Sequence, residues 1–247
     1  MEKKGNVGLI VGLIISILCI IGLVGFIVFD KIEENKRIQA PIIDYEKNEK
    51  LNEKDVESFL KRIDELNNAL YDNYPISDIH NLSTRDILSI GFNDIYGANY
   101  IPDTYIENHI RYIIGDNVDI KHEDYVCTND KIALWKYANG HYILNNDHPG
   151  HGGGYGYIIT TFFKDASMDD DTITINTNIL YEPASDVWGG PTTSYKASPN
   201  GEYILNDIQR DSLKSEYEKI KDTLPTTTFT FKRSKLGGYN LEKVTIK

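Results

Sequence analysis

A long apolar run near the amino terminus constrains this chain more than any other feature. Residues 7–29 contain no charged side chain, and Ser16 carries their only hydroxyl. At a rise of about 1.5 Å per residue, a helix of this length is about long enough to cross a hydrocarbon core about 30 Å thick. The run is apolar on all sides, unlike the stripe of a helix that packs on a soluble core. The sequence therefore predicts a transmembrane helix over residues 7–29.

The alternative to a permanent anchor is a cleaved signal peptide. Signal peptides have a shorter apolar region that ends in a pair of small residues of the A-x-A type, and residues 22–29 offer no such pair. A lipoprotein signal would need a small residue before its modified cysteine, whereas Leu18 precedes Cys19. We therefore expect an uncleaved, single-pass anchor.

The distribution of positive charge bears on the orientation of this helix. Lysine and arginine alone favour a cytoplasmic C-terminal side, because more of them follow the run than precede it. Long domains cross the membrane largely regardless of charge, however, and a short tail with Lys3 and Lys4 resembles the inner end of a signal anchor. We therefore expect residues 1–6 to form a short N-terminal tail and the C-terminal domain to lie outside the cell membrane.

The rest of the chain is acidic. After residue 29, 24 Lys and Arg residues stand against 36 Asp and Glu residues, a net charge of -12. Such a domain repels nucleic acids and anionic headgroups, so we predict no nucleic-acid partner. Residues 30–50 are highly charged and interrupted by Pro41, which is typical of a stalk or linker. The extracytoplasmic domain is then expected over residues 51–247.

Three segments of this domain have the apolar spacing of amphipathic helices. The first follows Asn52, a favourable capping residue, and its apolar residues recur with the helical period: Val56, Phe59, Leu60, Ile63, Leu66 and Leu70. The second starts at Ser83-x-x-Asp86, a pattern typical of a capping box. The third covers residues 103–114 and ends at Gly115, a usual C-terminal cap.

Beyond Gly115 the pattern changes to the alternation of β-strands. Asn139-Gly140 predicts a tight hairpin between residues 132–137 and 141–144, because both turn residues tolerate positive φ. Residues 157–164 and 172–181 predict two further strands, the second with one apolar and one polar face.

The C-terminal part completes the predicted domain. It offers a short hairpin at Asn200-Gly201, a helix over residues 207–221, and strands over residues 226–233 and 239–246. Helices that come first and strands that come later indicate an α+β domain, with helices packed on a mainly antiparallel sheet. This order is also similar to the NTF2-like or cystatin-like plan, a likeness that says nothing about function.

Several of these features together resemble membrane-anchored extracytoplasmic proteins of low-GC Gram-positive bacteria. They are the apolar run that ends in Phe29-Asp30-Lys31, the histidine and glycine stretch over residues 148–154, and the C-terminal strand pair after Leu224-Pro225, with Phe229, Phe231 and Val244. The resemblance spans most of the chain. It implies a location and a domain plan, and it implies no activity.

Three of the six histidines lie close together in the sequence, at His141, His148 and His151. Asp147 precedes His148, so imidazole nitrogens and a carboxylate could converge on zinc or another transition metal. Neither an H-E-x-x-H helix nor a cysteine pair accompanies them, and a Pro-Gly-rich turn with solvated histidines explains the same residues. We therefore predict no metal and no cofactor, and we keep His148 and His151 as candidate ligand-binding residues.

Trp188 is the third candidate ligand-binding residue. It lies in a Gly-Gly-Pro loop where neither a helix nor a strand pattern requires it. Exposed aromatic side chains are enriched at recognition sites, and Tyr155, Tyr157 and Tyr195 could add a stacking surface for a sugar or a peptide. The alternative is a tryptophan that folds back and fills its own loop.

These observations support a non-catalytic binding or interaction module as the first functional hypothesis, with a peptide, glycan or protein partner outside the cell. The second hypothesis is a metal-dependent enzyme that uses the loop of residues 141–151. The third is an assembly protein that oligomerises through its membrane helix, where Gly8, Gly12 and Ser16 have the small-xxx-small spacing. The first is preferred because the sequence contains no recognisable catalytic motif.

Overall fold

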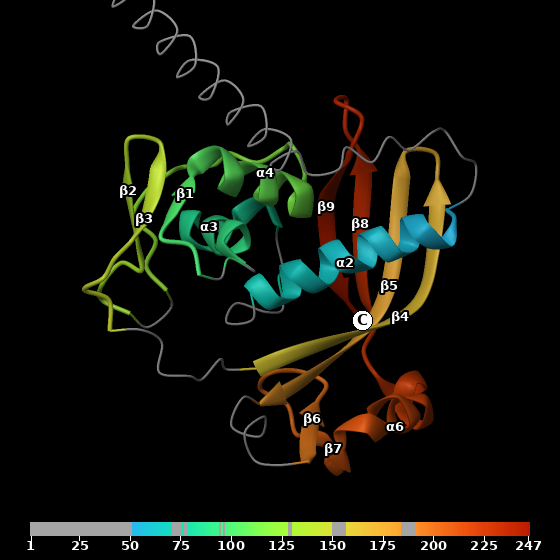
Figure 1. Cartoon of the computed structure of the whole chain (residues 1–247). Coiled ribbons are helices and arrows are strands. Elements are labelled where there is room, and N and C mark those ends of the chain that lie inside the picture. Colours follow the sequence, from blue (N-terminus) through green and yellow to red (C-terminus); the bar gives the residue numbers. More distant parts are fainter. Residues whose placement is uncertain are drawn as a thin grey trace, which may run out of the picture. The chain divides into compact units, whose positions relative to one another are not determined.

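The computed structural model describes residues 51–70, 76, 79–93, 95, 97–127, 130–149, 157–183 and 191–247 (Figure 1). The chain divides into two compact units, Met1–Ala40 and Pro41–Lys247, and all described residues belong to the second. The predicted tail 1–6, membrane helix 7–29 and stalk 30–50 lie outside the described residues. Among the residues that are described, no helix has the length and apolar character needed to span a bilayer.

The three predicted helices are confirmed as α2 (Glu53–Ala69), α3 (Thr84–Phe92) and α4 (Asp103–Ile114). Asn52 and Ser83 cap the first two, and each forms a reciprocal capping box with the acidic residue three positions later. These caps satisfy backbone N–H groups that have no partner inside a helix. A 3-10 turn, η2 (Ile79–Asn81), precedes α3.

A small antiparallel sheet follows α4 in the sequence. It contains β1 (Tyr100–Pro102), β3 (His141–Leu144) and β2 (Trp135–Ala138), in that order across the sheet. The hairpin turn at Asn139-Gly140 is confirmed, and its two residues have the positive φ angles, 52° and 80°, that a tight turn requires. Its first strand begins at Trp135 rather than at the predicted residue 132. β1 was not predicted, because three residues are too few to show an alternating pattern.

The larger sheet is also antiparallel. Its strands are β4 (Tyr157–Asp169), β5 (Thr172–Pro183), β6 (Thr192–Lys196), β7 (Tyr203–Gln209), β8 (Thr227–Arg233) and β9 (Tyr239–Ile246). The order is β7-β6-β5-β8-β9, and β4 pairs with β5 along its length. β4 is longer than predicted, because residues 165–169 continue the pairing up to a tight turn at Asp170, whose φ is 47°. β5 is longer at its other end, where Glu182 and Pro183 pair with the start of β4.

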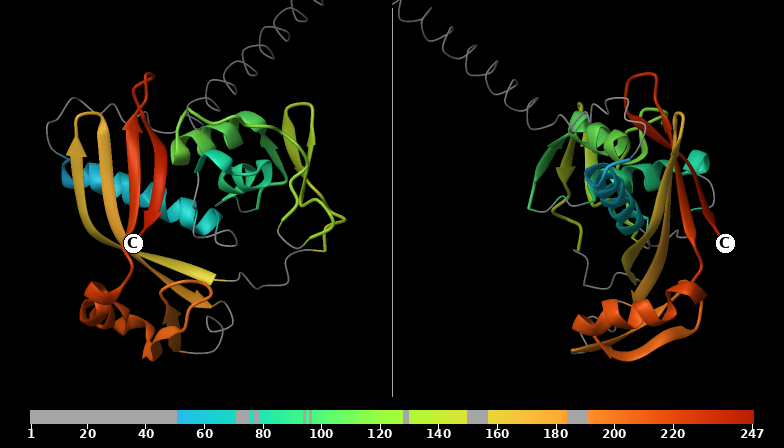
Figure 2. Two further views of the ribbon diagram at one scale, coloured as in Figure 1. Left: turned by 180° about the vertical axis from the view of Figure 1, so that it is seen from behind. Right: turned by 90° about the vertical axis from the view of Figure 1, so that its right-hand side faces the viewer.

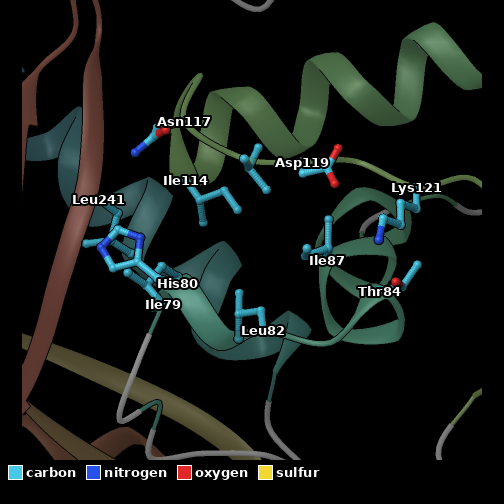
Figure 3. Close-up of a pocket in the computed structure, with 11 residues that line it drawn as sticks. Ile79, His80, Leu82, Thr84, Ile87, Ile114, Asn117, Asp119, Lys121 and Leu241 are labelled. Carbon is cyan, nitrogen blue, oxygen red and sulfur yellow. The ribbon is translucent and has the colours of Figure 1, made fainter.

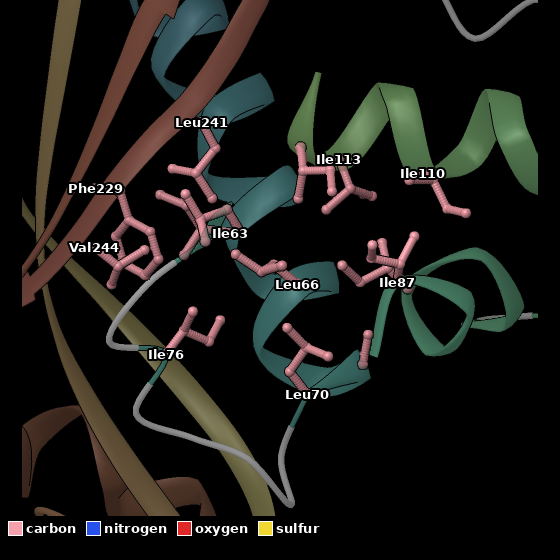
Figure 4. Close-up of a cluster of buried hydrophobic side chains, with 14 of the residues drawn as sticks. Ile63, Leu66, Leu70, Ile76, Ile87, Ile110, Ile113, Phe229, Leu241 and Val244 are labelled. Carbon is pink, nitrogen blue, oxygen red and sulfur yellow. The ribbon is translucent and has the colours of Figure 1, made fainter. Parts of the chain in front are cut away.

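The main hydrophobic core lies between the helices and one face of this sheet. Figure 2 shows α2 along that face. Ile63 and Leu66 of α2 meet Phe229 and Val244 of the sheet, while Ile113 brings α4 into the same cluster (Figure 4). Each of these buried side chains contributes about 1.5–3 kcal/mol relative to its exposed state. The mixed α+β architecture with an antiparallel sheet is therefore confirmed.

A second core covers part of the opposite face of the sheet. Leu180 points away from the main core, because its neighbours Ile179 and Tyr181 point into it and successive strand residues alternate. Leu180 packs with Tyr217 of α6 (Leu213–Ile220), and Phe162 stacks on the Tyr217 ring with centroids 3.9 Å apart. α6 starts later than the predicted residue 207, because β7 stays paired with β6 as far as Gln209.

The short elements around α6 complete the described chain. The 3-10 turns η3 (Arg210–Ser212) and η4 (Lys221–Thr223) lie on either side of it. The predicted turn at Asn200-Gly201 lies in the connection between β6 and β7, which pair as a hairpin. The final strand pair, β8 and β9, agrees with the prediction to within one residue at each end.

Candidate functional site

A groove lies between η2, the start of α3 and the segment that follows α4. Its volume is about 230 Å³ (Figure 3). Its floor is apolar and consists of Ile79, Leu82, Ile87, Ile114, Val118 and Leu241, and its rim is polar and consists of His80, Thr84, Asn117, Asp119 and Lys121. We call this cavity the α3–α4 groove. Polar atoms contribute most of the surface exposed inside the groove, and the apolar side chains contribute the smaller part. The groove therefore combines polar recognition groups with a limited apolar surface.

The floor is fixed by elements whose ends the sequence defines clearly. Ile87 lies in the first turn of α3 after the Ser83 capping box, and Ile114 is the last residue of α4. The chain leaves α4 at Gly115, where φ is 101° and a β-carbon would lie 2.6 Å from the Cα of Asn240. Glycine is required there by both its φ angle and the close approach of β9. This turn directs residues 117–121 along the groove.

The rim carries charges of both signs. Figure 3 shows Asp119 and Lys121 on one side of the groove and His80 on the other. The His80 side chain is 52% exposed, and its Nε2 lies 3.9 Å from Oε2 of Glu242. Asp119 and Lys121 are exposed and form no ion pair with any other described residue. The rim therefore suits a polar ligand with both acidic and basic groups better than a strongly charged one.

Residues 117–121 belong to no sheet, and their backbone runs along the groove (Figure 3). Val118 and Ile120 are partly buried against the main core, whereas Asn117, Asp119 and Lys121 are exposed. This alternation is that of a half-buried strand. Within the described part of the chain, neither the backbone nor the side chains of these five residues form a hydrogen bond. The segment thus has the alternating exposure of a β-strand, but no neighbouring strand pairs with it among the described residues.

A chain of polar side chains lies just beyond this segment. Glu107 Oε1 is 3.1 Å from His122 Nε2, and His122 Nδ1 is 2.9 Å from the hydroxyl of Tyr142. The His122 ring also stacks on Tyr137, whose hydroxyl donates to Asp103 at 3.0 Å. The carboxylate–imidazole–hydroxyl order is that of a catalytic relay.

The terminal hydroxyl of this chain is not placed for catalysis. Tyr142 is fully buried, and burial raises the pKa of its hydroxyl well above the ordinary value. A buried phenol that stays protonated is neither a nucleophile nor a base for a bound substrate. Since both ring nitrogens of His122 already have side-chain partners, the cluster serves to fix residue 122 against the β2–β3 hairpin.

The structure gives His148 and His141 different partners. The His148 side chain is only 2% exposed, and its Nε2 lies 3.0 Å from Oδ2 of Asp130. His141 stacks on Tyr100, and its Nδ1 lies 2.9 Å from the Asn139 carbonyl oxygen. His148 is thus a buried, paired side chain, not a solvated loop residue.

The two remaining candidates, His151 and Trp188, lie outside the described residues. Among the residues that the structure does describe, no group of three or more His, Cys, Asp and Glu side chains could hold a metal ion. The loop of residues 141–151 therefore contributes no assembled metal centre within its described part.

The groove residues were not predicted as a site. Alternation of Val118 and Ile120 with polar neighbours was present in the sequence, but five residues without a turn signal do not distinguish a strand from a loop. The apolar groove floor comes from residues about 160 positions apart, between Ile79 and Leu241, which only the tertiary structure brings together.

Comparison of the chain with protein families, with curated proteins and with solved structures finds no match.

Proposed function

We propose that this protein is a membrane-anchored extracytoplasmic binding module, without catalytic activity, that holds an apolar group of its ligand in the α3–α4 groove. The groove itself carries the proposal, because it combines an apolar floor with hydrogen-bonding groups at the rim. Its partner would be a peptide, glycan or protein outside the cell.

Binding is favoured over catalysis by the chemistry of the lining. Thr84 and Lys121 are the hydroxyl and amine side chains of the groove, and neither hydrogen-bonds to a histidine or carboxylate in the described part of the chain. An activated nucleophile needs such a base within hydrogen-bond reach. The groove supplies contact surface and polar recognition instead.

The location rests on the amino-terminal sequence. Residues 7–29 would form the single membrane helix, residues 30–50 the stalk, and the acidic domain would be displayed outside. A long helix, α2, across an antiparallel sheet also supports a cystatin-like or NTF2-like plan for the domain. Such a plan would not indicate a function by itself, because function depends on the residues of the site rather than on the fold.

Groove binding is tested with a small apolar probe, N-acetyl-leucine methylamide, and the full-length chain in phosphatidylcholine nanodiscs. The isoleucine δ-methyl NMR signals of Ile79, Ile87 and Ile114 should shift, because these residues line the groove. Those of Ile63 and Ile175 are buried elsewhere and should not move. Uniform shifts, or none at high probe concentration, would contradict the proposal.

Two substitutions that fill the groove sharpen this test. Leu82→Trp and Thr84→Tyr should abolish the shifts, since both residues line the cavity. Leu236→Trp is the matched control, because Leu236 is 80% exposed in the turn between β8 and β9. The proposal requires that the control keeps binding while at least one folded filling variant loses it.

The membrane location needs its own experiment. Vesicles that contain the full-length chain are washed with alkaline carbonate and then treated with protease from one side. A tethered external domain stays in the pellet and is digested from the outer side only. Release by carbonate would refute the anchor, and protection from outside protease would refute the orientation.

A further inference from the structure

We infer that the α3–α4 groove binds an extended peptide, which pairs with residues 117–121 as an added β-strand and inserts an apolar side chain into the cavity. The inference rests on the proposed function, because it names the chemical class of the ligand for the same site. Three independent observations support it: the backbone of the segment, the size of the cavity, and the charges of the rim.

The backbone of residues 117–121 has hydrogen-bonding groups that could pair with an added strand. The segment alternates between packed and exposed side chains as a strand does, yet its N–H and C=O groups bond to no other described residue. A row of unpaired backbone groups on an extended segment is the template that strand addition uses. Pairing with a peptide would satisfy these groups in the same way as a neighbouring strand.

The cavity has the size of a side chain rather than of a complete small ligand. Its volume of about 230 Å³ is below the range of about 300–1,000 Å³ that is typical of small-molecule sites. Val118, a packed residue of the segment, lies in the wall of this cavity. In an added strand, the residue opposite Val118 points to the same face, so its side chain would enter the cavity. An apolar residue is expected at that position.

The charges of the rim indicate which charges are preferred at the peptide positions opposite Asp119 and Lys121. Asp119 and Lys121 lie two positions apart on the exposed side of the segment. Opposite charges on directly paired residues stabilise strand pairing, and like charges destabilise it. All strand pairs in the described chain are antiparallel, and we take the same direction for the peptide. The preferred peptide therefore reads acidic, apolar, basic, apolar.

The direct test measures the affinity of the peptide acetyl-Ser-Glu-Leu-Lys-Leu-Ser-amide for the full-length chain in phosphatidylcholine nanodiscs. It should bind at least about tenfold more tightly than N-acetyl-leucine methylamide, since each added backbone hydrogen bond is worth about fivefold in affinity. The capped leucine could shift the groove isoleucine methyl signals while the peptide binds no more tightly than the capped leucine. That result would overturn this inference and leave the proposed function standing. Failure of both probes would overturn both.

Backbone pairing has a separate signature. Alternate residues of a strand direct their N–H groups to opposite edges, so N-methylation of one alternating set should weaken binding at least about tenfold, while methylation of the other set is tolerated. An equal effect of both sets would show that the peptide does not pair as a strand, and would refute the inference.

The charge rule is tested by reversing one rim residue. Lys121→Glu should reverse the preference, so that a peptide with lysine in place of its glutamate binds more tightly than the original by about threefold or more. Lys54→Glu is the matched control, because Lys54 is exposed in the first turn of α2 and outside the groove. The same change in preference in both variants would exclude a specific role of Lys121.

Discussion

Arg62 Nη2 donates a hydrogen bond of 2.8 Å to the carbonyl oxygen of Tyr239 and so joins α2 to β9. The same guanidinium donates from Nε and Nη2 to the carbonyl oxygen of Ile113, at 3.2 and 3.1 Å, near the end of α4. One buried side chain thus satisfies backbone groups of two other elements. Those elements carry Ile114 and Leu241 of the groove floor, so Arg62 holds the two sides of this floor together.

Arg62→Met should be strongly destabilising, because it removes the donors to two buried carbonyl groups. We expect a loss of about 3 kcal/mol in the free energy of unfolding, measured by denaturant titration. Arg85→Met is the control, because the Arg85 side chain is 43% exposed. Equal losses in the two variants would show that the buried contacts are unimportant.

Gly115 and Gly237 offer a matched pair of substitutions. Their φ angles are nearly equal, at 101° and 103°, but a β-carbon at Gly115 would meet Asn240, whereas nothing lies within 4 Å at Gly237. Alanine at Gly237 should cost about 1 kcal/mol from backbone strain alone. Alanine at Gly115 should cost about 2–4 kcal/mol, since overpacking is added. Thermal unfolding measures both, and a cost at Gly115 no larger than at Gly237 would contradict the described packing.

Alkaline pH should destabilise the fold through Tyr195. Burial, and then the nearby Glu182 carboxylate, raise the pKa of Tyr195 to about 12, above the ordinary value of about 10. The unfolded chain therefore loses this proton first, so the stabilisation that is complete below about pH 10 is lost as the pH rises through about 12. Tyr195→Phe should make the decline of unfolding free energy over this range less steep without abolishing it, because burial also raises the pKa of Tyr125, Tyr142 and Tyr181. Tyr203→Phe, at an exposed tyrosine, should leave the decline as steep as in the parent chain.

Most of the fold was predictable because its signals are local. The capping boxes at Asn52 and Ser83, the stop at Gly115 and the turn at Asn139-Gly140 each act through neighbouring residues. The start of α6 was predicted too early because the backbone of Gln209 pairs with Thr192, a contact that helical spacing does not reveal. Local propensity was overridden there by pairing between strands.

The site was less predictable than the fold, because its parts are distant in sequence. His148 was grouped with His151 on sequence proximity, whereas the structure pairs it with Asp130, which precedes β2 in the sequence. Proximity of residues in the sequence does not show which side chains are buried or which partners they contact. The groove forms where η2, α4 and β9 come together in the fold. No residue spacing in the sequence predicts that these three elements are neighbours.

Hydrogen exchange of the backbone amides of residues 117–121 tests the central claim most directly. These amides have no hydrogen-bond partner among the described residues, so they should exchange rapidly in the free full-length chain. With a saturating amount of acetyl-Ser-Glu-Leu-Lys-Leu-Ser-amide, alternate amides of the segment should exchange at least about tenfold more slowly. Unchanged exchange throughout the segment, at a peptide concentration that saturates binding, would contradict the account.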